Sequence, residues 1–274
     1  MGPPPLACSV RGCTLPLERR DRTFVCAARH SYDLARSGYV NLLQPQDRRS
    51  ASAGDPRAAI EARASLLVAG VGRALITGVA TRAASFDLGD SPVVADLGCG
   101  SGDALAAVTD RAGTGVGIDL SIAAVERAAR NFPDRTWVVA NADRRLPLLD
   151  RSVNLVLSLH GRRNPAEVAR VLVAAGYLLV AVPAADDLIE LRELVQGQPV
   201  ERDRVSQLLV EHEPLFQLDE RSVVRDTHEL DRDALVKLLR GTYRGVRRGA
   251  AERVAALERM RVTLASELVV FRLR

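Results

Sequence analysis

The stretch VVADLGCGSGD, residues 93–103, decides the fold of this chain. It begins as a short apolar strand, passes through three alternating glycines, Gly98, Gly100 and Gly102, and continues into a helix-like segment. Glycine permits a tight turn and lets a ligand approach the backbone closely. An acid, Asp96, lies two residues before the first glycine. The stretch therefore predicts a strand–turn–helix unit whose turn holds a ligand.

Short apolar segments alternate with helix-like segments over most of the chain that follows. This alternation is typical of a parallel sheet covered by helices on both faces. The predicted strands are 92–97, 114–121, 136–143, 152–161, 177–183 and 266–274, and the predicted helices are 103–112, 122–132, 165–176, 231–240 and 250–260. A further strand containing a turn is expected within 216–230, and helices are expected within 55–84 and 185–215. We predict an α/β fold with a doubly wound, mostly parallel, Rossmann-like sheet.

Two further acids follow the predicted strands at regular places. Asp119 ends the second strand, and Asp143 ends the third. Glycines spaced G-x-G-x-G, preceded by Asp96, resemble motif I of class I S-adenosylmethionine-dependent methyltransferases, whereas a dinucleotide site favours G-x-G-x-x-G. The resemblance implies that the glycine turn wraps the methionine part, Asp119 holds the ribose and Asp143 lies beside the adenine. The neighbouring Leu120 and Asn141 complete the expected cofactor-binding residues. The alternative is a nucleotide or dinucleotide binder of similar winding.

Three cysteines and a histidine gather near the N-terminus. Cys8, Cys13, Cys26 and His30 have the spacing C-x4-C, twelve residues, then C-x3-H. Zinc takes four sulfur or nitrogen donors in a tetrahedron, and paired ligands on two turns supply them. Residues 1–45 are expected to be loop-rich and poor in strands, so a metal would hold them folded. We predict a structural zinc site; the alternative is three free thiols and a surface histidine.

The segments after the cysteines carry a second resemblance. CAARHSYDLARSGYVNLL, residues 26–43, and GDPRAAIEARASLLVAG, residues 54–70, are similar to the start of the bacterial 23S rRNA guanine-N1 methyltransferases. In that family a Cys3His zinc module precedes a methyltransferase domain. The resemblance implies S-adenosylmethionine and Zn²⁺ as cofactors, 23S rRNA or another structured RNA as partner, and a homodimer. It implies three parts: a zinc-binding RNA-recognition module at 1–45, a helical linker at 46–90 and a methyltransferase domain at 91–274.

The sequence departs from the family near the expected target base. The family's first cysteine pair is usually C-x2-C, and Gly70, Val71 and Gly72 stand where it tends to carry Gly-His-Tyr. After the fourth strand this chain has HGRRNP, residues 160–165, in place of a Tyr/Phe-Ala-Pro phrase. The resemblance therefore supports the fold and the cofactor site, whereas it does not carry over the identity of the target nucleoside.

The altered loop supplies the candidate catalytic residues. His160 lies at the carboxyl end of the fourth predicted strand, where doubly wound sheets place substrate. We predict that His160 accepts the N1 proton or contacts the base edge. Arg162, with Arg163, is a candidate for contact with phosphate or base. The alternatives are a hydrogen-bonded histidine that closes the strand and two arginines in a solvated loop.

Positive charge in this chain is almost entirely arginine. The net charge is +4, and Lys237 is the only lysine. Arginine binds phosphate bidentately and stacks on bases, although a GC-rich genome produces the same bias. The arginines expected to contact RNA are Arg11, Arg19, Arg20, Arg22, Arg29, Arg240, Arg244, Arg247 and Arg248. No apolar run approaches the roughly 18 residues of a membrane span, and no secretory leader is evident. We expect a cytoplasmic protein with no membrane partner.

Three functions are consistent with these features. The first is an S-adenosylmethionine-dependent RNA methyltransferase that acts on a guanine N1 of 23S rRNA. The second is a small-molecule methyltransferase on the same scaffold, suggested by the altered loop and the modest net charge. The third is a binding protein that keeps the cofactor fold without turnover.

Overall fold

The structure is a computed structural model that describes residues 2–45, 54–110, 113–196, 203–242 and 249–274. Within these residues the N-terminal segment forms a small antiparallel sheet in the order β1-β2-β3. Its strands are β1 (Leu17–Arg20), β2 (Thr23–Cys26) and β3 (Ser31–Asp33). The expectation of a strand-poor N-terminus is therefore wrong, because short strands rich in polar residues pair across the tight turn at Asp21.

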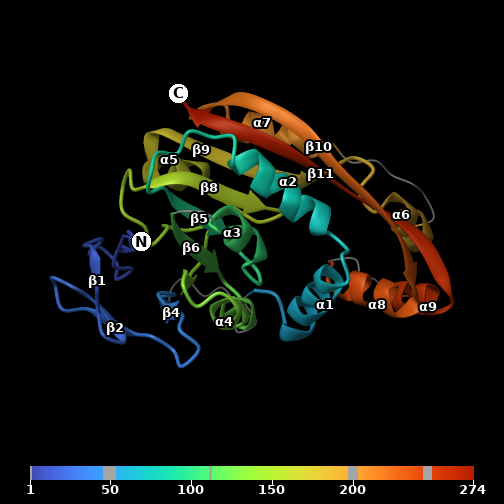
Figure 1. Cartoon of the computed structure of the whole chain (residues 1–274), viewed down its shortest axis with the longest axis horizontal. Helices are drawn as coiled ribbons and strands as arrows, with labels where there is room; N and C mark the ends of the chain where they lie inside the picture. The colour runs from blue at the N-terminus through green and yellow to red at the C-terminus, as the bar shows by residue number, and fades with distance from the viewer. Residues whose placement is uncertain (1, 46–53, 111–112, 197–202, 243–248) are drawn as a thin grey trace.

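The main sheet has the order β10-β11-β9-β8-β5-β6-β7-β4 (Figure 1). Its strands are β4 (Val40–Asn41), β5 (Val93–Leu97), β6 (Thr114–Asp119), β7 (Thr136–Val139), β8 (Val153–Leu159), β9 (Leu172–Pro183), β10 (Phe216–Asp231) and β11 (Arg259–Leu273). The strands from β4 to β9 pair in parallel, whereas β11 and β10 join antiparallel. The predicted doubly wound, mostly parallel sheet and the separate N-terminal module are confirmed.

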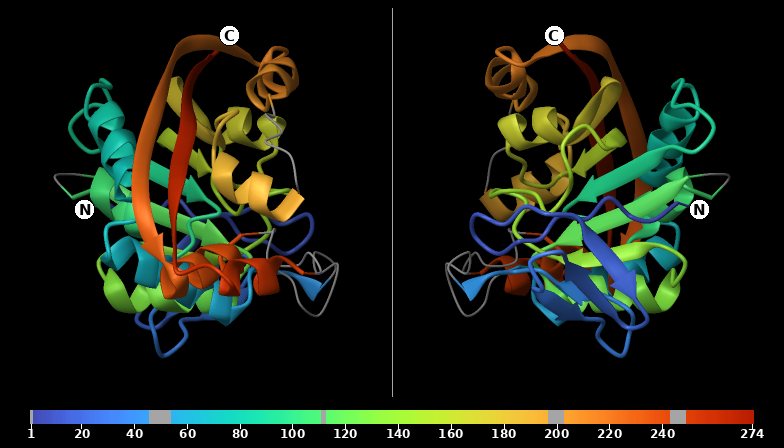
Figure 2. Two further views of the ribbon diagram at one scale, coloured as in Figure 1. Left: turned by 90° about the vertical axis from the view of Figure 1, so that its right-hand side faces the viewer. Right: turned by 90° about the vertical axis from the view of Figure 1, so that its left-hand side faces the viewer.

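Helices cover both faces of the main sheet (Figures 1 and 2). They are α1 (Arg57–Val68), α2 (Arg73–Ala83), α3 (Asp103–Val108), α4 (Ile122–Asn131), α5 (Pro165–Val171), α6 (Ile189–Gln196), α7 (Val205–His212), α8 (Arg232–Arg240) and α9 (Ala250–Ala255). Ala95 and Leu97 of β5 pack in a core with α5, α7 and the N-terminal sheet. Val94 packs on the opposite face with α2, α3 and α4, as alternation along a strand requires.

A third apolar cluster lies at the far end of the long antiparallel pair β10–β11. Leu66 of α1, Leu191 of α6, Leu235 of α8 and Val254 of α9 belong to it. The two paired strands reach these helices beyond the rest of the sheet, as Figure 1 shows. Among the described residues, no single helix is long and apolar enough to cross a membrane; α1 and α2 meet that test only when counted together across a bend of 78°.

Several predicted elements differ from the structure, among them the helix predicted at 250–260, which ends at Ala255. Residues 216–230 contain no turn, because β10 pairs with β11 from Phe216 to Asp231 with one irregularity at Leu218/Glu220. The helix predicted at 165–176 ends at Val171, because β9 begins at Leu172, which pairs with Val153 of β8. The last strand begins at Arg259 rather than 266. The domain limits at residues 45 and 90 stay a prediction.

Candidate functional site

The glycine turn joins β5 to α3 and bends sharply. The backbone φ is +76° at Gly98, +53° at Gly100 and +86° at Gly102, a region that favours glycine. A Cβ atom at Gly100 would meet no heavy atom within 4 Å. At Gly102 a Cβ atom would collide with the indole ring of Trp137. Packing therefore requires glycine at position 102, whereas Gly100 borders open space in which a ligand can approach the backbone.

Two acids lie close to this turn. Asp96 is 2% exposed, and its Oδ1 atom has no hydrogen-bond partner among the described residues. Burial raises the pKa of Asp96 to about 7, and the Asp119 charge acts in the same direction. Asp119 accepts hydrogen bonds from the backbone N–H groups of Gly100, at 2.9 Å, and Ser121, at 2.7 Å. A buried carboxylate oxygen without a partner fits a ligand that brings a donor or a positive charge, such as the amino group of S-adenosylmethionine.

The other predicted cofactor residues lie at the carboxyl ends of the neighbouring strands. Asn141 Oδ1 accepts a hydrogen bond from the backbone N–H of Asp143 at 3.0 Å, which shapes the turn after β7. Asp143 is exposed, and its Oδ2 lies 3.4 Å from Nη1 of Arg162. Leu120 is half-buried beside Asp119. These positions fit the adenosine part of the cofactor, and their assignment as its ligands stays a prediction.

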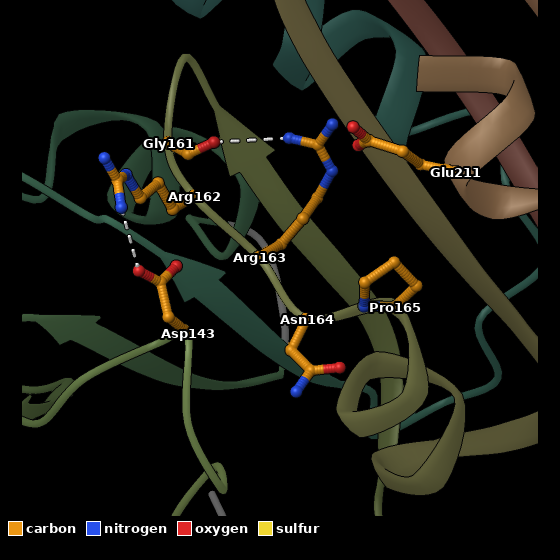
Figure 3. A pocket seen from close by; sticks show the side chains of 7 residues that line it. All are labelled: Asp143, Gly161, Arg162, Arg163, Asn164, Pro165 and Glu211. Atoms are coloured by element: carbon orange, nitrogen blue, oxygen red, sulfur yellow. Dashed lines mark hydrogen bonds and ion pairs between the residues drawn. The ribbon is translucent and has the colours of Figure 1, made fainter. Parts of the chain in front are cut away.

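A cavity of about 470 Å³ opens next to Asp143 (Figure 3). The residues that line it are Asp143, Gly161, Arg162, Arg163, Asn164, Pro165 and Glu211. Most of them belong to the loop after β8, and Glu211 comes from α7. Asn164 Oδ1 accepts from the backbone N–H of Ala166 at 3.1 Å and so fixes where the loop enters α5. The cavity thus brings two guanidinium groups and two carboxylates together.

His160 begins the loop after β8 in the left-handed region, with φ at +54°. Its Nε2 lies 2.9 Å from Oγ of the buried Ser266 on β11. Crowding by protein atoms lowers the pKa of His160 to about 4, and the charge of Arg204 acts in the same direction, although part of the residue surface stays open to solvent. The imidazole is therefore neutral at pH 7. Its assignment as a catalytic group stays a prediction.

The four predicted zinc ligands lie together. One ligand atom from each of Cys8, Cys13, Cys26 and His30 lies within 4.8 Å of all the others. Cys13 Sγ and Cys26 Sγ are 3.8 Å apart, and His30 Nδ1 is 3.4 Å from Cys8 Sγ and 3.5 Å from Cys26 Sγ. Zinc–sulfur bonds of about 2.3 Å in a tetrahedron place two sulfurs about 3.8 Å apart. The donor set and its spacing fit a structural zinc ion.

The zinc-ligand module contacts the core at the loop after β7. The backbone N–H of Ala7 donates to Pro147 O at 3.0 Å, and Leu6 pairs with Leu148. A cavity of about 250 Å³ lies at this junction, lined from both sides by residues that include Arg11 and Asn141. The module therefore adjoins the edge of the sheet that carries the predicted cofactor residues. Among the arginines expected to contact RNA, Arg244, Arg247 and Arg248 lie outside the described residues.

Sequence reasoning missed three residues around the cavity. Ser266 bonds His160, Glu211 lines the cavity, and His212 accepts a hydrogen bond from Arg163 Nε at 3.2 Å. All three come from segments after residue 185 that carry no recognisable motif. Glu211 and His212 lie in the polar helical stretch 185–215, and nothing in that stretch indicates that it contacts the distant loop after β8.

The sheet order, the glycine turn with its acids and the Cys3His cluster together define a class I S-adenosylmethionine-dependent methyltransferase with an N-terminal zinc module. Residues 7–51 match the family described as RlmA, N-terminal, a zinc ribbon, and residues 94–177 match the family described as methyltransferase domain. The chain belongs to the 23S rRNA guanine-N1 methyltransferase family, as its curated relatives establish.

One such relative is the 23S rRNA (guanine(748)-N(1))-methyltransferase of Streptomyces fradiae, which is 36% identical over 232 residues, 83% of this chain and 81% of the relative. Another is YxjB of Bacillus subtilis (strain 168), 33% identical over 230 residues, 81% of this chain and 80% of the relative. The crystal structure of YcgJ from Bacillus subtilis has the same core fold, with a TM-score of 0.50 and 18% identity over 72% of this chain and 97% of that one.

Proposed function

We propose that this enzyme methylates N1 of a guanine in 23S rRNA. The observation that carries the proposal is the junction of the zinc-ligand module with the cofactor edge of the sheet. It occurs in a chain that is 36% identical over 83% of its length to a 23S rRNA (guanine(748)-N(1))-methyltransferase. A metal-held module beside a methyl-transfer site suits a structured RNA, whose target base has to leave its stack to reach the methyl donor.

Methyl transfer needs an activated methyl group and an accurately placed nucleophile. S-adenosylmethionine supplies the methyl group on a sulfonium, which makes it ready for displacement. Asp96 and the glycine turn would hold the methionine part, and Asp119 and Asp143 the adenosine part. The chain's task is then to place guanine N1 in line with the methyl carbon. N1 loses its proton, a nitrogen–carbon bond forms, and the carbon–sulfur bond breaks with its electron pair going to sulfur.

His160 and Arg162 are the proposed reacting-site residues from the loop after β8. His160 is neutral at pH 7, and its Nδ1 atom has no hydrogen-bond partner among the described residues, so this atom is free to accept a hydrogen bond from guanine N1–H or another base N–H as the N1 proton leaves. Arg162 has a side chain that is 82% exposed and pairs with Asp143 at 3.4 Å. Its exposure suits a contact with the RNA backbone.

The RNA proposal also bears on location and assembly. Ribosomal RNA as substrate agrees with the predicted cytoplasmic location. The homodimer is implied by the family resemblance alone, and light scattering of the purified, zinc-loaded protein tests it.

The test of the function uses zinc-loaded protein, labelled S-adenosylmethionine and 23S rRNA transcribed without modifications. We expect label in the rRNA and one strong reverse-transcription stop, because a methyl group at N1 blocks base pairing. Asp119→Asn should abolish labelling by weakening cofactor binding, which calorimetry measures separately. Rates should fall steeply with salt, because contacts with phosphate release counterions.

The same experiment separates the two alternatives considered from the sequence. Label that enters a small-molecule extract but not rRNA, at a rate insensitive to salt, would favour a small-molecule methyltransferase. Tight cofactor binding with no transfer to any RNA would favour a binding protein.

A further inference from the structure

Arg163 is held in the cavity from two sides. Its Nε donates to His212 Nε2 at 3.2 Å, and its Nη1 donates to Gly161 O at 3.2 Å. The neighbouring Arg162 differs, because its side chain is 82% exposed. A guanidinium has five N–H donors in one plane, and Nη2 of Arg163 makes no hydrogen bond among the described residues. Arg163 therefore keeps an unused donor group beside the cavity that it lines; Figure 3 shows its guanidinium between Gly161 O and the Glu211 carboxylate.

His212 is the group that fixes this orientation. Its Nδ1 lies 2.8 Å from the carbonyl oxygen of Leu208, which only accepts, so Nδ1 carries the proton and Nε2 accepts from Arg163. The imidazole is fully buried, with its ring centroid 5.0 Å from that of Phe271 and 5.8 Å from that of Phe216. Burial lowers the pKa of His212, which keeps it a neutral acceptor.

The surroundings of Arg163 favour an electron-rich ligand. Burial lowers the pKa of this guanidinium, and the Glu211 charge acts in the opposite direction. Glu211 is exposed and already accepts a hydrogen bond from Gln207 at 2.8 Å. A partly desolvated cation that faces a cavity gains from a ligand with acceptor atoms. The cavity also reaches Asp143, the residue expected beside the cofactor adenine.

We propose that Arg163, positioned by His212, binds the O6 and N7 acceptors of the target guanine and leaves N1 facing the methyl donor. This proposal rests on the proposed function. A bidentate arginine at O6 and N7 is the commonest specific contact with guanine. When the N1–H bond breaks, its electron pair delocalises onto O6, so donors at O6 stabilise the charge that develops. Arg163 thereby selects guanine and assists the loss of its proton.

The experiment compares three bases at the methylated position, which the mapping above identifies. An rRNA hairpin carries guanine, 7-deazaguanine, which lacks the N7 acceptor, or hypoxanthine, which lacks only the 2-amino group. We expect kcat/KM of the wild-type holoenzyme to fall about tenfold with 7-deazaguanine, and about threefold at most with hypoxanthine.

Variants then show which side chain causes the fall in kcat/KM with 7-deazaguanine, which we call the N7 penalty. Arg163→Met should methylate guanine and 7-deazaguanine with equal kcat/KM. Arg162→Met removes the same charge from the next residue and should keep the tenfold penalty. His212→Phe keeps an aromatic ring but removes the acceptor, so its N7 penalty should shrink to about threefold while circular dichroism shows the same fold, whereas His212→Gln restores an acceptor and part of the penalty.

Two results would overturn the proposed role of Arg163 and leave the proposed function standing. One is a wild-type enzyme that methylates 7-deazaguanine as fast as guanine, and the other is an Arg163→Met enzyme that keeps the penalty. If Arg163→Met does not fold, the wild-type base comparison and His212→Phe decide. An enzyme that methylates no rRNA would overturn the proposed function, and this proposal with it.

Discussion

Alanine at Gly102 should mainly lower stability, whereas alanine at Gly100 should mainly weaken cofactor binding. At Gly102 an alanine Cβ would collide with Trp137, which is 1% exposed, and would lie 3.0 Å from the Cβ of Ala128. Overpacking costs about 1–3 kcal/mol, and an alanine in the left-handed region adds roughly 1–2 kcal/mol. Gly102→Ala should therefore lower the free energy of unfolding by about 2–5 kcal/mol.

At Gly100 an alanine Cβ would meet no protein atom within 4 Å, and φ is +53°. Gly100→Ala should lose only the roughly 1–2 kcal/mol of backbone strain. Its methyl group occupies the space that we assign to the cofactor, so the Kd for S-adenosylmethionine should rise by about 5- to 150-fold, the equivalent of about 1–3 kcal/mol.

Urea unfolding of the cofactor-free proteins measures the loss of stability, and isothermal titration calorimetry measures the Kd for S-adenosylmethionine. Gly89→Ala is a matched control, because φ at Gly89 is +76° in an exposed loop with no atom within 4 Å of the added Cβ. It should show the strain cost alone and bind the cofactor normally. Cofactor binding by Gly100→Ala with the wild-type Kd would refute the placement of the ligand against this turn.

Three further predictions concern the metal, a buried acid and an ion-pair network. Cys26→Ser, or removal of zinc by a chelator, should unfold the N-terminal module and abolish RNA binding while cofactor binding persists; intact RNA binding by metal-free protein would contradict a structural role. The raised pKa of Asp96 means that the folded state binds a proton more tightly than the unfolded state, so stability falls as pH rises from about 4 to about 7 and then levels off. Asp96→Asn should therefore stabilise the cofactor-free protein by about 4 kcal/mol at pH 8 and hardly at all near pH 4, while weakening cofactor binding; equal destabilisation at both pH values in urea would contradict this sign. Arg170→Met should lower the free energy of unfolding in urea by about 3 kcal/mol, because the 16%-exposed Arg170 side chain pairs with Glu167 and donates to Leu148 O at 2.9 Å. The control Arg130→Met, at an exposed ion pair, should lower it by less than about 1 kcal/mol.

Local chemistry made much of this protein predictable from its sequence. The glycine turn, the acids after successive strands and the Cys3His spacing depend on residues that are close in the chain or at strand ends. Alternating apolar segments were sufficient for the parallel sheet. The same approach failed at 172–176, because alanine-rich apolar residues suit helices and strands equally. The pairing of Leu172 and Tyr177 with β8, on either side of an irregularity, makes this segment part of β9.

Long-range contacts set the limit of prediction at the candidate site. The turn expected within 216–230 is absent because β11 pairs with β10 along its length, and no residue within 216–230 indicates that β11 is the partner strand. The bond between Arg163 and His212 joins residues 49 positions apart. Such a pair has no signature in either segment, so the orientation of Arg163 became visible only in the folded chain.

The two-residue strand β4 has a consequence for any attempt to shorten this enzyme. It comes from the segment directly after the zinc ligands, yet it completes the main sheet by pairing with β7 through Val40 and Asn41. A truncated catalytic fragment that starts beyond it would carry a bare β7 edge, and unpaired edges invite intermolecular association. The β4–β7 pairing thus joins the N-terminal zinc-ligand module to the methyltransferase sheet. A chimera that exchanges either part with a relative has to preserve this strand pairing.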